Sequence, residues 1–268
     1  MKKINKKLIN IIRNNKMLEI FAYLVQNFLK INNQGFGRFL KIHDNFVRIS
    51  ENYVNQLGPE AFTNKVILEL GTGFSRSGML YLIKKYNIKT VYCYDRYNCL
   101  HENELNIIKE QGLECYMDRL IYIVGENRDI LNYIDIDSVD TIVSNAVLEF
   151  VSDLDSLAKV LGSVAKSDSV SFHKVDLKCH NKFKPYGELY FHTFSNYLWK
   201  LMGERVGQLN RKLPHEYVKN FNDNGFVCKM TNVEKFSKKD LLYAEKYLNV
   251  NNVQLYSTSG LCLFLIKK

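Results

Sequence analysis

The chain has 268 residues, of which 46% are hydrophobic and 24% are charged. These proportions are those of a globular protein, and they exclude a disordered, a collagen-like or a disulfide-stapled chain. The formal net charge of +9 leaves nucleic acid, an anionic membrane and an acidic substrate open as partners.

The excess positive charge is concentrated at the N-terminus. Residues 1–30 carry +6, which leaves only +3 for the other 238 residues. Within residues 3–32, apolar residues recur with helical spacing and basic residues fall opposite Ile4, Leu8 and Ile11. We expect one helix or a helix pair that packs on the main domain, with pairing to another subunit and contact with an anionic membrane as alternatives.

Two further features concern organisation and compartment. Helical segments are expected up to residue 56, so residues 1–60 form a helical N-terminal segment and residues 61–268 the main domain, with Gly58-Pro59 at its entry. The six cysteines have no C-x-x-C or zinc spacing, and no signal peptide or stretch of about 18 apolar residues is present. We therefore expect a cytoplasmic protein with reduced thiols.

From residue 65 onward, short strand-like runs alternate with amphipathic helical stretches. Such alternation predicts an α/β fold built from βαβ units, with a mainly parallel sheet and helices on both faces. The expected strands are 66–70, 90–94, 120–124, 141–144, 170–175, 226–230 and 261–266, and the expected helices are 76–86, 101–111, 153–165 and 239–247.

The first strand runs into a turn that contains Gly71 and Gly73. Glycines there allow the backbone to approach a ligand closely. Arg76 stands where the dinucleotide fingerprint G-x-G-x-x-G requires glycine, which weakens that interpretation. The run Glu69-Leu70-Gly71-Thr72-Gly73 instead resembles motif I of the class I methyltransferases that use S-adenosylmethionine. The resemblance implies that the glycine turn lies against the methionine part of the cofactor and that Glu69 anchors its polar end.

Acidic residues follow the next two strands. Asp95 ends the second strand, where a carboxylate can accept hydrogen bonds from both ribose hydroxyls; capping of the next helix is the alternative. The segment Gly125-Glu126-Asn127 resembles the Gly-Asp-Ala segment of the family. That resemblance implies that Glu126 and the amide of Asn127 hold the adenine edge, with an exposed polar loop as the alternative.

The fourth expected strand belongs to the run Asp140–Val151, which resembles the family pattern D-x-I-x-S-x-A-V-L-E-H-V. Phe150 replaces the histidine of that pattern, and the resemblance implies that Ser144 lies at the cofactor. The run lacks the N-P-P-Y tetrad of enzymes that methylate amino groups of nucleic-acid bases. This difference favours another acceptor.

The fifth strand leads into the run His173–His180, which resembles an H-x-x-D-L-x-D-H element of a bacterial small-molecule branch of the family. Cys179 occupies the second acidic position. We expect His173 or His180 to remove the acceptor's proton, with Asp176 orienting the base or binding the substrate. A metal site and a structural polar network are the alternatives.

The acceptor pocket is expected to be covered by an insertion of residues 181–212, which is rich in aromatic residues and contains Tyr190. Arg211 lies in a run that resembles the family's N-R-L-x-x-x-Y helix, and a guanidinium there can bind a carboxylate or phosphate. Both residues are candidates for substrate binding.

The order of these motifs resembles a class I methyltransferase with a seven-stranded, mostly parallel sheet whose last strand is antiparallel. The resemblance implies methyl transfer from S-adenosylmethionine to an oxygen of a small sugar- or phosphate-bearing acceptor, in the modification of surface polysaccharides. RNA methylation is an alternative, although the nearly balanced charge of residues 61–268 speaks against a nucleic-acid partner. A third alternative is an inactive partner subunit, because Phe150 and Cys179 depart from the family's motifs.

Overall fold

The computed structural model describes residues 15–28, 42–179, 187–202, 208–248 and 253–268. Residues 1–14 with their basic side chains, His180 and residues 181–186 lie outside these ranges, so the predictions made for them remain predictions. Within the described residues, no helix combines the length and the apolar composition needed to cross a membrane.

The described residues belong to two compact units, which are treated separately below. The sheet unit comprises the described parts of Gly37–Val175, His215–Thr231 and Cys262–Lys268. The aromatic unit comprises the described parts of Met1–Phe36, Asp176–Pro214 and Asn232–Leu261.

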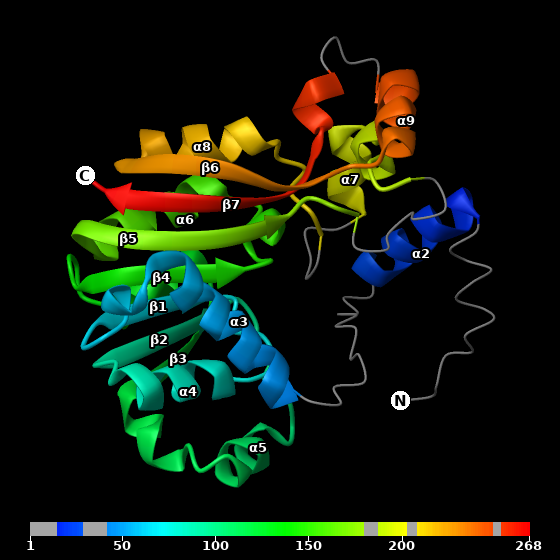
Figure 1. Ribbon diagram of the computed structural model, residues 1–268. Helices are drawn as coiled ribbons and strands as arrows, with labels where there is room; N and C mark the ends of the chain where they lie inside the picture. The colour runs from blue at the N-terminus through cyan, green and yellow to red at the C-terminus, as the bar shows by residue number, and fades with distance from the viewer. Residues whose placement is uncertain (1–14, 29–41, 180–186, 203–207, 249–252) are drawn as a thin grey trace. The chain divides into compact units, whose positions relative to one another are not determined.

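Strands and helices alternate along the chain as the sequence predicts (Figure 1). The strands are β1 (Val66–Leu70), β2 (Thr90–Asp95), β3 (Leu120–Val124), β4 (Val139–Asn145), β5 (Ala165–Asp176), β6 (Phe226–Lys235) and β7 (Thr258–Lys267). The helices are α2 (Lys16–Phe28), α3 (Ile42–Leu57), α4 (Ser77–Tyr86), α5 (Glu104–Glu110), α6 (Leu154–Val164), α7 (Asn196–Leu201), α8 (Pro214–Asp223) and α9 (Lys238–Leu248).

One seven-stranded sheet has the strand order β3-β2-β1-β4-β5-β7-β6. Strands β1 to β5 pair in parallel, and the carboxyl ends of β1, β2 and β3 therefore lie side by side at one edge. The chain reverses for β7, whose arrow runs opposite to β6 in Figure 1. The N–H of Lys268, just after β7, donates to the carbonyl of Gly225, just before β6 (3.0 Å). The predicted fold class, including the antiparallel last strand, is confirmed.

Alternate residues of β5 show how the sheet unit buries both faces of the sheet. Phe172 is fully buried and its ring centroid lies 6.3 Å from that of Tyr53 on α3. The next residue, His173, is also fully buried, and its ring stacks on Phe221 of α8 at 5.7 Å. Because successive side chains of a strand point to opposite faces, α3 and α8 cover opposite faces of the sheet.

The N-terminal part of the sequence is organised differently from the expected division at residue 60. Helix α3 belongs to the sheet unit, and its Tyr53 and Val54 are part of the hydrophobic core beside Leu80 and Ile83 of α4. The expected insertion 181–212 falls within the aromatic unit, which also takes up α9 and its surroundings. Both units are assembled from segments that are distant in sequence, and this cannot be read from local composition.

Candidate functional site

The turn after β1 has a backbone conformation that requires glycine. Gly71 and Gly73 have φ angles of +69° and +70°, in the left-handed region. A Cβ on Gly71 would lie 2.2 Å from the side chain of Val147, so no larger residue fits there without a shift. The N–H groups of Gly71 and Thr72 donate to the carbonyl of Tyr94 at 2.7 and 3.3 Å, which fastens the turn to the end of β2.

Asp95 is held directly beside this turn. Its Oδ2 accepts the N–H of Gly73 at 3.0 Å, and its Oδ1 accepts the N–H of Tyr97 at 3.2 Å. Burial raises the pKa of the Asp95 carboxyl, and the hydrogen bonds from Gly73 and Tyr97 act in the opposite direction. The structure thus brings together the glycine turn and the predicted ribose acceptor, which are 22 residues apart in sequence.

Glu69 lies next to the same turn but is buried, with 5% of its surface exposed. Burial raises its pKa to about 7, and the nearby charge of Asp95 adds to this, while the neighbouring side chains of Thr72 and Cys93 oppose it. The Sγ of Cys93 lies 3.7 Å from Glu69 Oε2. A carboxyl group that titrates near neutral pH, beside a turn of this kind, is a candidate contact for a cationic group of a ligand.

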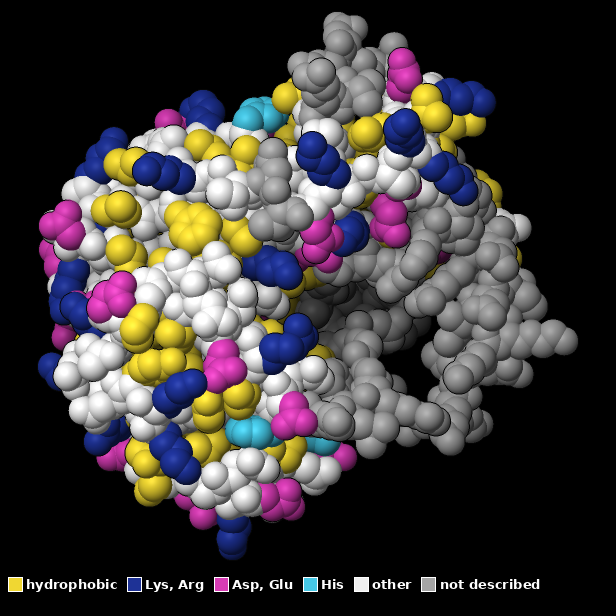
Figure 2. Space-filling view, in the orientation of Figure 1, with side chains coloured by type: hydrophobic (Ala, Val, Ile, Leu, Met, Phe, Trp, Pro, Cys, Tyr) yellow, Lys and Arg dark blue, Asp and Glu magenta, His cyan; other side chains and the backbone are white. Residues whose placement is uncertain are grey.

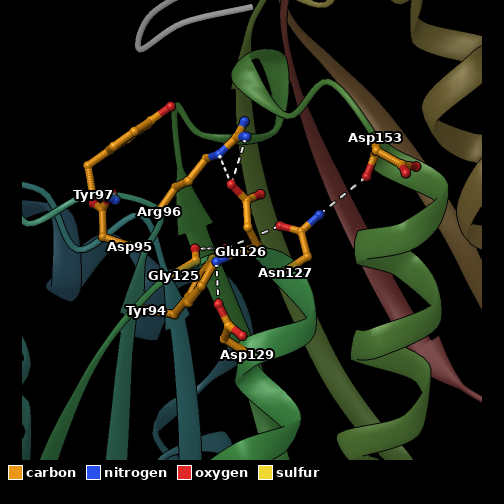
Figure 3. A network of polar contacts seen from close by, with 9 residues as sticks. All are labelled: Tyr94, Asp95, Arg96, Tyr97, Gly125, Glu126, Asn127, Asp129 and Asp153. Carbon is orange, nitrogen blue, oxygen red and sulfur yellow. Dashed lines mark hydrogen bonds and ion pairs between the residues drawn. The ribbon is translucent and has the colours of Figure 1, made fainter. Parts of the chain in front are cut away.

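The loop after β3 carries the two residues predicted to hold adenine (Figure 3). Glu126 caps the 3-10 helix η3 (Asn127–Asn132): its side chain accepts the N–H of Asp129, and Asp129 accepts the N–H of Glu126 at 2.7 Å. The side chain of Asn127 accepts the hydroxyl of Tyr94 at 3.2 Å. The backbone N–H of Asn127, at the first position of η3, has no partner within that helix.

Two residues at the end of β2 join this loop to the predicted ribose site, and sequence reasoning missed both. The hydroxyl of Tyr94 also donates to the carbonyl of Gly125 at 2.9 Å. Arg96 pairs with Glu126, its Nε and one terminal nitrogen lying 3.2 and 2.9 Å from Oε1 (Figure 3). The only signal in the sequence was that Tyr94 and Arg96 flank Asp95, because their partners lie about 30 residues further on.

Ser144 and His173 lie opposite each other on β4 and β5, and both are fully buried. Ser144 Oγ is 2.8 Å from His173 Nδ1, and burial lowers the pKa of His173 to about 3. A neutral imidazole with so low a pKa is a weak base at neutral pH. The environment of His173 therefore does not support the predicted role of general base and suits a structural role in the core.

Burial of a neutral histidine predicts loss of stability in acid. The unfolded chain protonates His173 near pH 6.5 and the folded chain only near pH 3, so the contribution to the free energy of unfolding falls as the pH drops below 6.5. The slope reaches about 1.4 kcal/mol per pH unit. We expect His173→Asn, which keeps a polar atom near Ser144, to flatten the pH dependence of unfolding in urea between pH 6.5 and 5. An unchanged slope would mean that His173 is already charged in the folded protein.

The other predicted acceptor residues belong to the aromatic unit. Asp176 ends β5, and its Oδ1 accepts the N–H of Lys178 at 3.0 Å. Tyr190 is buried, with its ring edge-on to Phe194 at 5.2 Å and to Tyr243 at 6.0 Å. These contacts place Tyr190 in the core of the aromatic unit. Packing in that core explains its position without a role in substrate binding.

Arg211 makes contacts within the same unit that sequence reasoning did not foresee. Its guanidinium donates to the carbonyl of Phe194 at 2.6 Å and to the side-chain oxygen of Asn196, and it lies over the ring of Trp199 at 5.3 Å. Burial lowers its pKa. Arg211 therefore holds this segment together through neutral acceptors, whatever it binds in addition.

Two further observations concern surface charge and metal-ligating residues. On the face shown in Figure 2, lysine and arginine side chains are interspersed with acidic and apolar ones. Among the described residues, no group of three or more His, Cys, Asp or Glu side chains could hold a metal ion.

Comparison with known proteins gives matches of structure only. No protein-family model matches the chain, and no curated protein matches it in sequence. The chain is similar to geranyl diphosphate C-methyltransferase from Streptomyces coelicolor, with 14% identity, a TM-score of 0.54 and coverage of 82% of this chain and 76% of that chain. It is similar to a candidate sarcosine dimethylglycine methyltransferase from Galdieria sulphuraria, with 14% identity, a TM-score of 0.52 and coverage of 83% and 86%.

A third similar structure is phosphoethanolamine N-methyltransferase 2 from Haemonchus contortus in complex with S-adenosyl-L-methionine, with 15% identity and a TM-score of 0.53. There, 82% of this chain matches 52% of that chain. The named acceptors of the three proteins differ, so what they share with this chain is the architecture. The chain has the fold of the class I S-adenosylmethionine-dependent methyltransferases.

Proposed function

We propose that the chain is an S-adenosylmethionine-dependent methyltransferase. The observation that carries the proposal is the hydrogen bond between Gly73 and Asp95, which unites the glycine turn and the acidic end of β2 at the carboxyl edge of the sheet. In open α/β folds, ligands bind at this edge. The fold and the methyltransferases that share it support the same cofactor.

The residues predicted to contact the cofactor all belong to the sheet unit. Asp95 accepts the ribose hydroxyls, and the glycine turn, whose Gly71 has no room for a Cβ beside Val147, lies against the methionine part. Glu69 attracts the cofactor's ammonium group when it is ionised. Glu126 and the N–H of Asn127 hold the adenine edge, and Ser144 lies near the end of β4, which borders β1 in the sheet.

The reaction we propose is methylation of an oxygen of a small sugar- or phosphate-bearing acceptor, in the modification of a surface polysaccharide. When bound, the cofactor supplies the methyl group. The chain has to align the acceptor oxygen and take up its proton. We assign the proton to Asp176 or His180, because burial makes His173 a poor base. Tyr190 and Arg211 remain candidates for acceptor binding, and this part of the proposal rests on the resemblance of the motifs.

Ligand binding tests the cofactor assignment first. A ligand that binds only the folded state at 100 times its Kd adds about 2.7 kcal/mol to the free energy of unfolding. We expect S-adenosylhomocysteine at that excess to raise the Tm by about 5 °C or more, while NAD, the control for the dinucleotide interpretation, leaves it unchanged. The absence of a shift at saturating S-adenosylhomocysteine would contradict the proposal.

Turnover separates the enzyme from an inactive subunit with the same fold. Methyl-labelled S-adenosylmethionine is incubated with sugars, sugar phosphates and RNA as acceptors. We expect label on an oxygen of a small acceptor with equimolar release of S-adenosylhomocysteine. Label on RNA would support the alternative of an RNA methyltransferase. Cofactor binding without transfer to any acceptor would support the alternative of an inactive partner subunit.

A further inference from the structure

Arg96 joins the two loops that flank the predicted nucleoside site. It directly follows Asp95, the predicted ribose acceptor, and two of its nitrogens donate to one oxygen of Glu126, the predicted adenine acceptor. Figure 3 shows the guanidinium extending from the end of β2 to the Glu126 carboxylate at the start of η3. All three residues belong to the sheet unit.

The Arg96–Glu126 pair contributes little to folding. The side chain of Arg96 is 39% exposed and that of Glu126 is 69% exposed. Ion pairs with this exposure are weakened by water and by dissolved salt, and many of them have no measurable effect on stability. The position of the pair beside the predicted ribose acceptor makes ligand binding the role to test.

Each residue of the pair makes a second contact. The guanidinium of Arg96 lies over the ring of Tyr97 at 5.7 Å. The carboxylate of Glu126 accepts the N–H of Asp129 as the cap of η3. The ion pair with Arg96 further restricts the side-chain conformation of Glu126, so that its carboxylate has a defined orientation as a hydrogen-bond acceptor.

We propose that Arg96 is a positioning residue for recognition of the purine 6-amino group, acting through Glu126. This inference rests on the proposed function, because it assumes that the nucleoside of S-adenosylmethionine lies across the ends of β1, β2 and β3. An exposed glutamate loses side-chain conformational entropy when it is fixed on binding, and a pre-formed pair removes part of that cost.

The role of Arg96 can be measured as the ratio of the protein's affinities for two ligands that differ in the purine. The probes are S-adenosylhomocysteine and S-inosylhomocysteine, in which a 6-oxo group replaces the 6-amino group and faces a carboxylate unfavourably. Because a hydrogen bond to a charged group is strong, we expect the protein to bind the adenosine compound at least about 10-fold more tightly. Arg96→Gln is expected to lower this ratio by up to about fivefold, mainly through weaker binding of S-adenosylhomocysteine, with an unchanged Tm.

Two further variants make the result specific. Arg128→Gln removes an exposed positive charge from η3 without removing a hydrogen bond or ion pair to Glu126, and should leave the ratio unchanged. In the Glu126→Gln background, adding Arg96→Gln should have no further effect on the ratio, because Arg96 acts through Glu126.

Three outcomes would overturn the inference. The first is an unchanged ratio of the two affinities in Arg96→Gln, and the second is an equal fall of this ratio in Arg128→Gln. The third is that Arg96→Gln changes the ratio equally in the unaltered protein and in the Glu126→Gln background. Each is distinct from failure of the proposed function, in which the unaltered protein binds neither homocysteine compound.

Discussion

Replacement of Asp95 by Asn is expected to weaken the binding of S-adenosylhomocysteine about 100-fold. The carboxylate is proposed to accept both ribose hydroxyls, and hydrogen bonds to a charged acceptor contribute about 1.5–3 kcal/mol each. Asparagine has one acceptor oxygen and no charge, so at least one of these bonds is lost. The Kd is measured by calorimetry on the folded variant.

Asp95→Asn is also expected to lower the stability of the fold, because both oxygens of Asp95 accept backbone N–H groups. Gly73 and Tyr97 donate to different oxygens of Asp95, so asparagine can satisfy only one of the two N–H groups. A loss of about 1–3 kcal/mol in the free energy of unfolding is therefore expected in urea titrations. Asp118→Asn, on an exposed residue, is the matched control and should change neither quantity. If Asp95→Asn binds as tightly as the unaltered protein, Asp95 is not part of the site.

Replacement of Glu69 by Gln is expected to raise stability and to weaken cofactor binding at the same time. In the folded chain the pKa of Glu69 is about 7, against 4.5 in the unfolded chain. The folded chain holds the extra proton between these values, so stability falls as the pH rises from 4.5 to 7 and the loss is complete above 7. Neutral glutamine avoids this loss, which amounts to about 3 kcal/mol at pH 8.

Measurements at two pH values separate this effect from a general change in packing. At pH 8, Glu69→Gln should have a higher Tm than the unaltered protein, and at pH 5 the two should be nearly equal. Affinity for S-adenosylmethionine should increase as the pH rises through 7 in the unaltered protein and stay flat in Glu69→Gln. A lower Tm of the variant at pH 8 would show that the ionised carboxylate is stabilised where it lies.

The local pattern of the sequence was sufficient for the elements of the sheet and for part of the site. Mainly apolar runs of five or six residues predicted β1, β2 and β3 to within one residue, because the strands of a parallel sheet are rich in apolar residues. The glycine turn and Asp95 could also be recognised, since each follows directly from the end of a strand. These features depend on residues that are adjacent in sequence.

The properties of the buried ionisable groups depended on the tertiary structure. Burial raises the pKa of Glu69 and lowers that of His173, and it arises from elements far away in sequence, such as α8 with Phe221. The sequence pattern around His173 predicted a base, but its ring lies in the core, where the charged form is disfavoured.

The pairing of Arg96 with Glu126 was likewise decided only by the fold. The two residues are 30 positions apart, and they meet because β2 and β3 are neighbours in the parallel sheet. The division into two units has the same cause, since each unit gathers segments from three parts of the chain. By itself the sequence determined which helices and strands form and which residues end them, because these are local properties. The contact partners and the protonation of the site residues were decided by the tertiary structure, because they depend on contacts that exist only once the chain is folded.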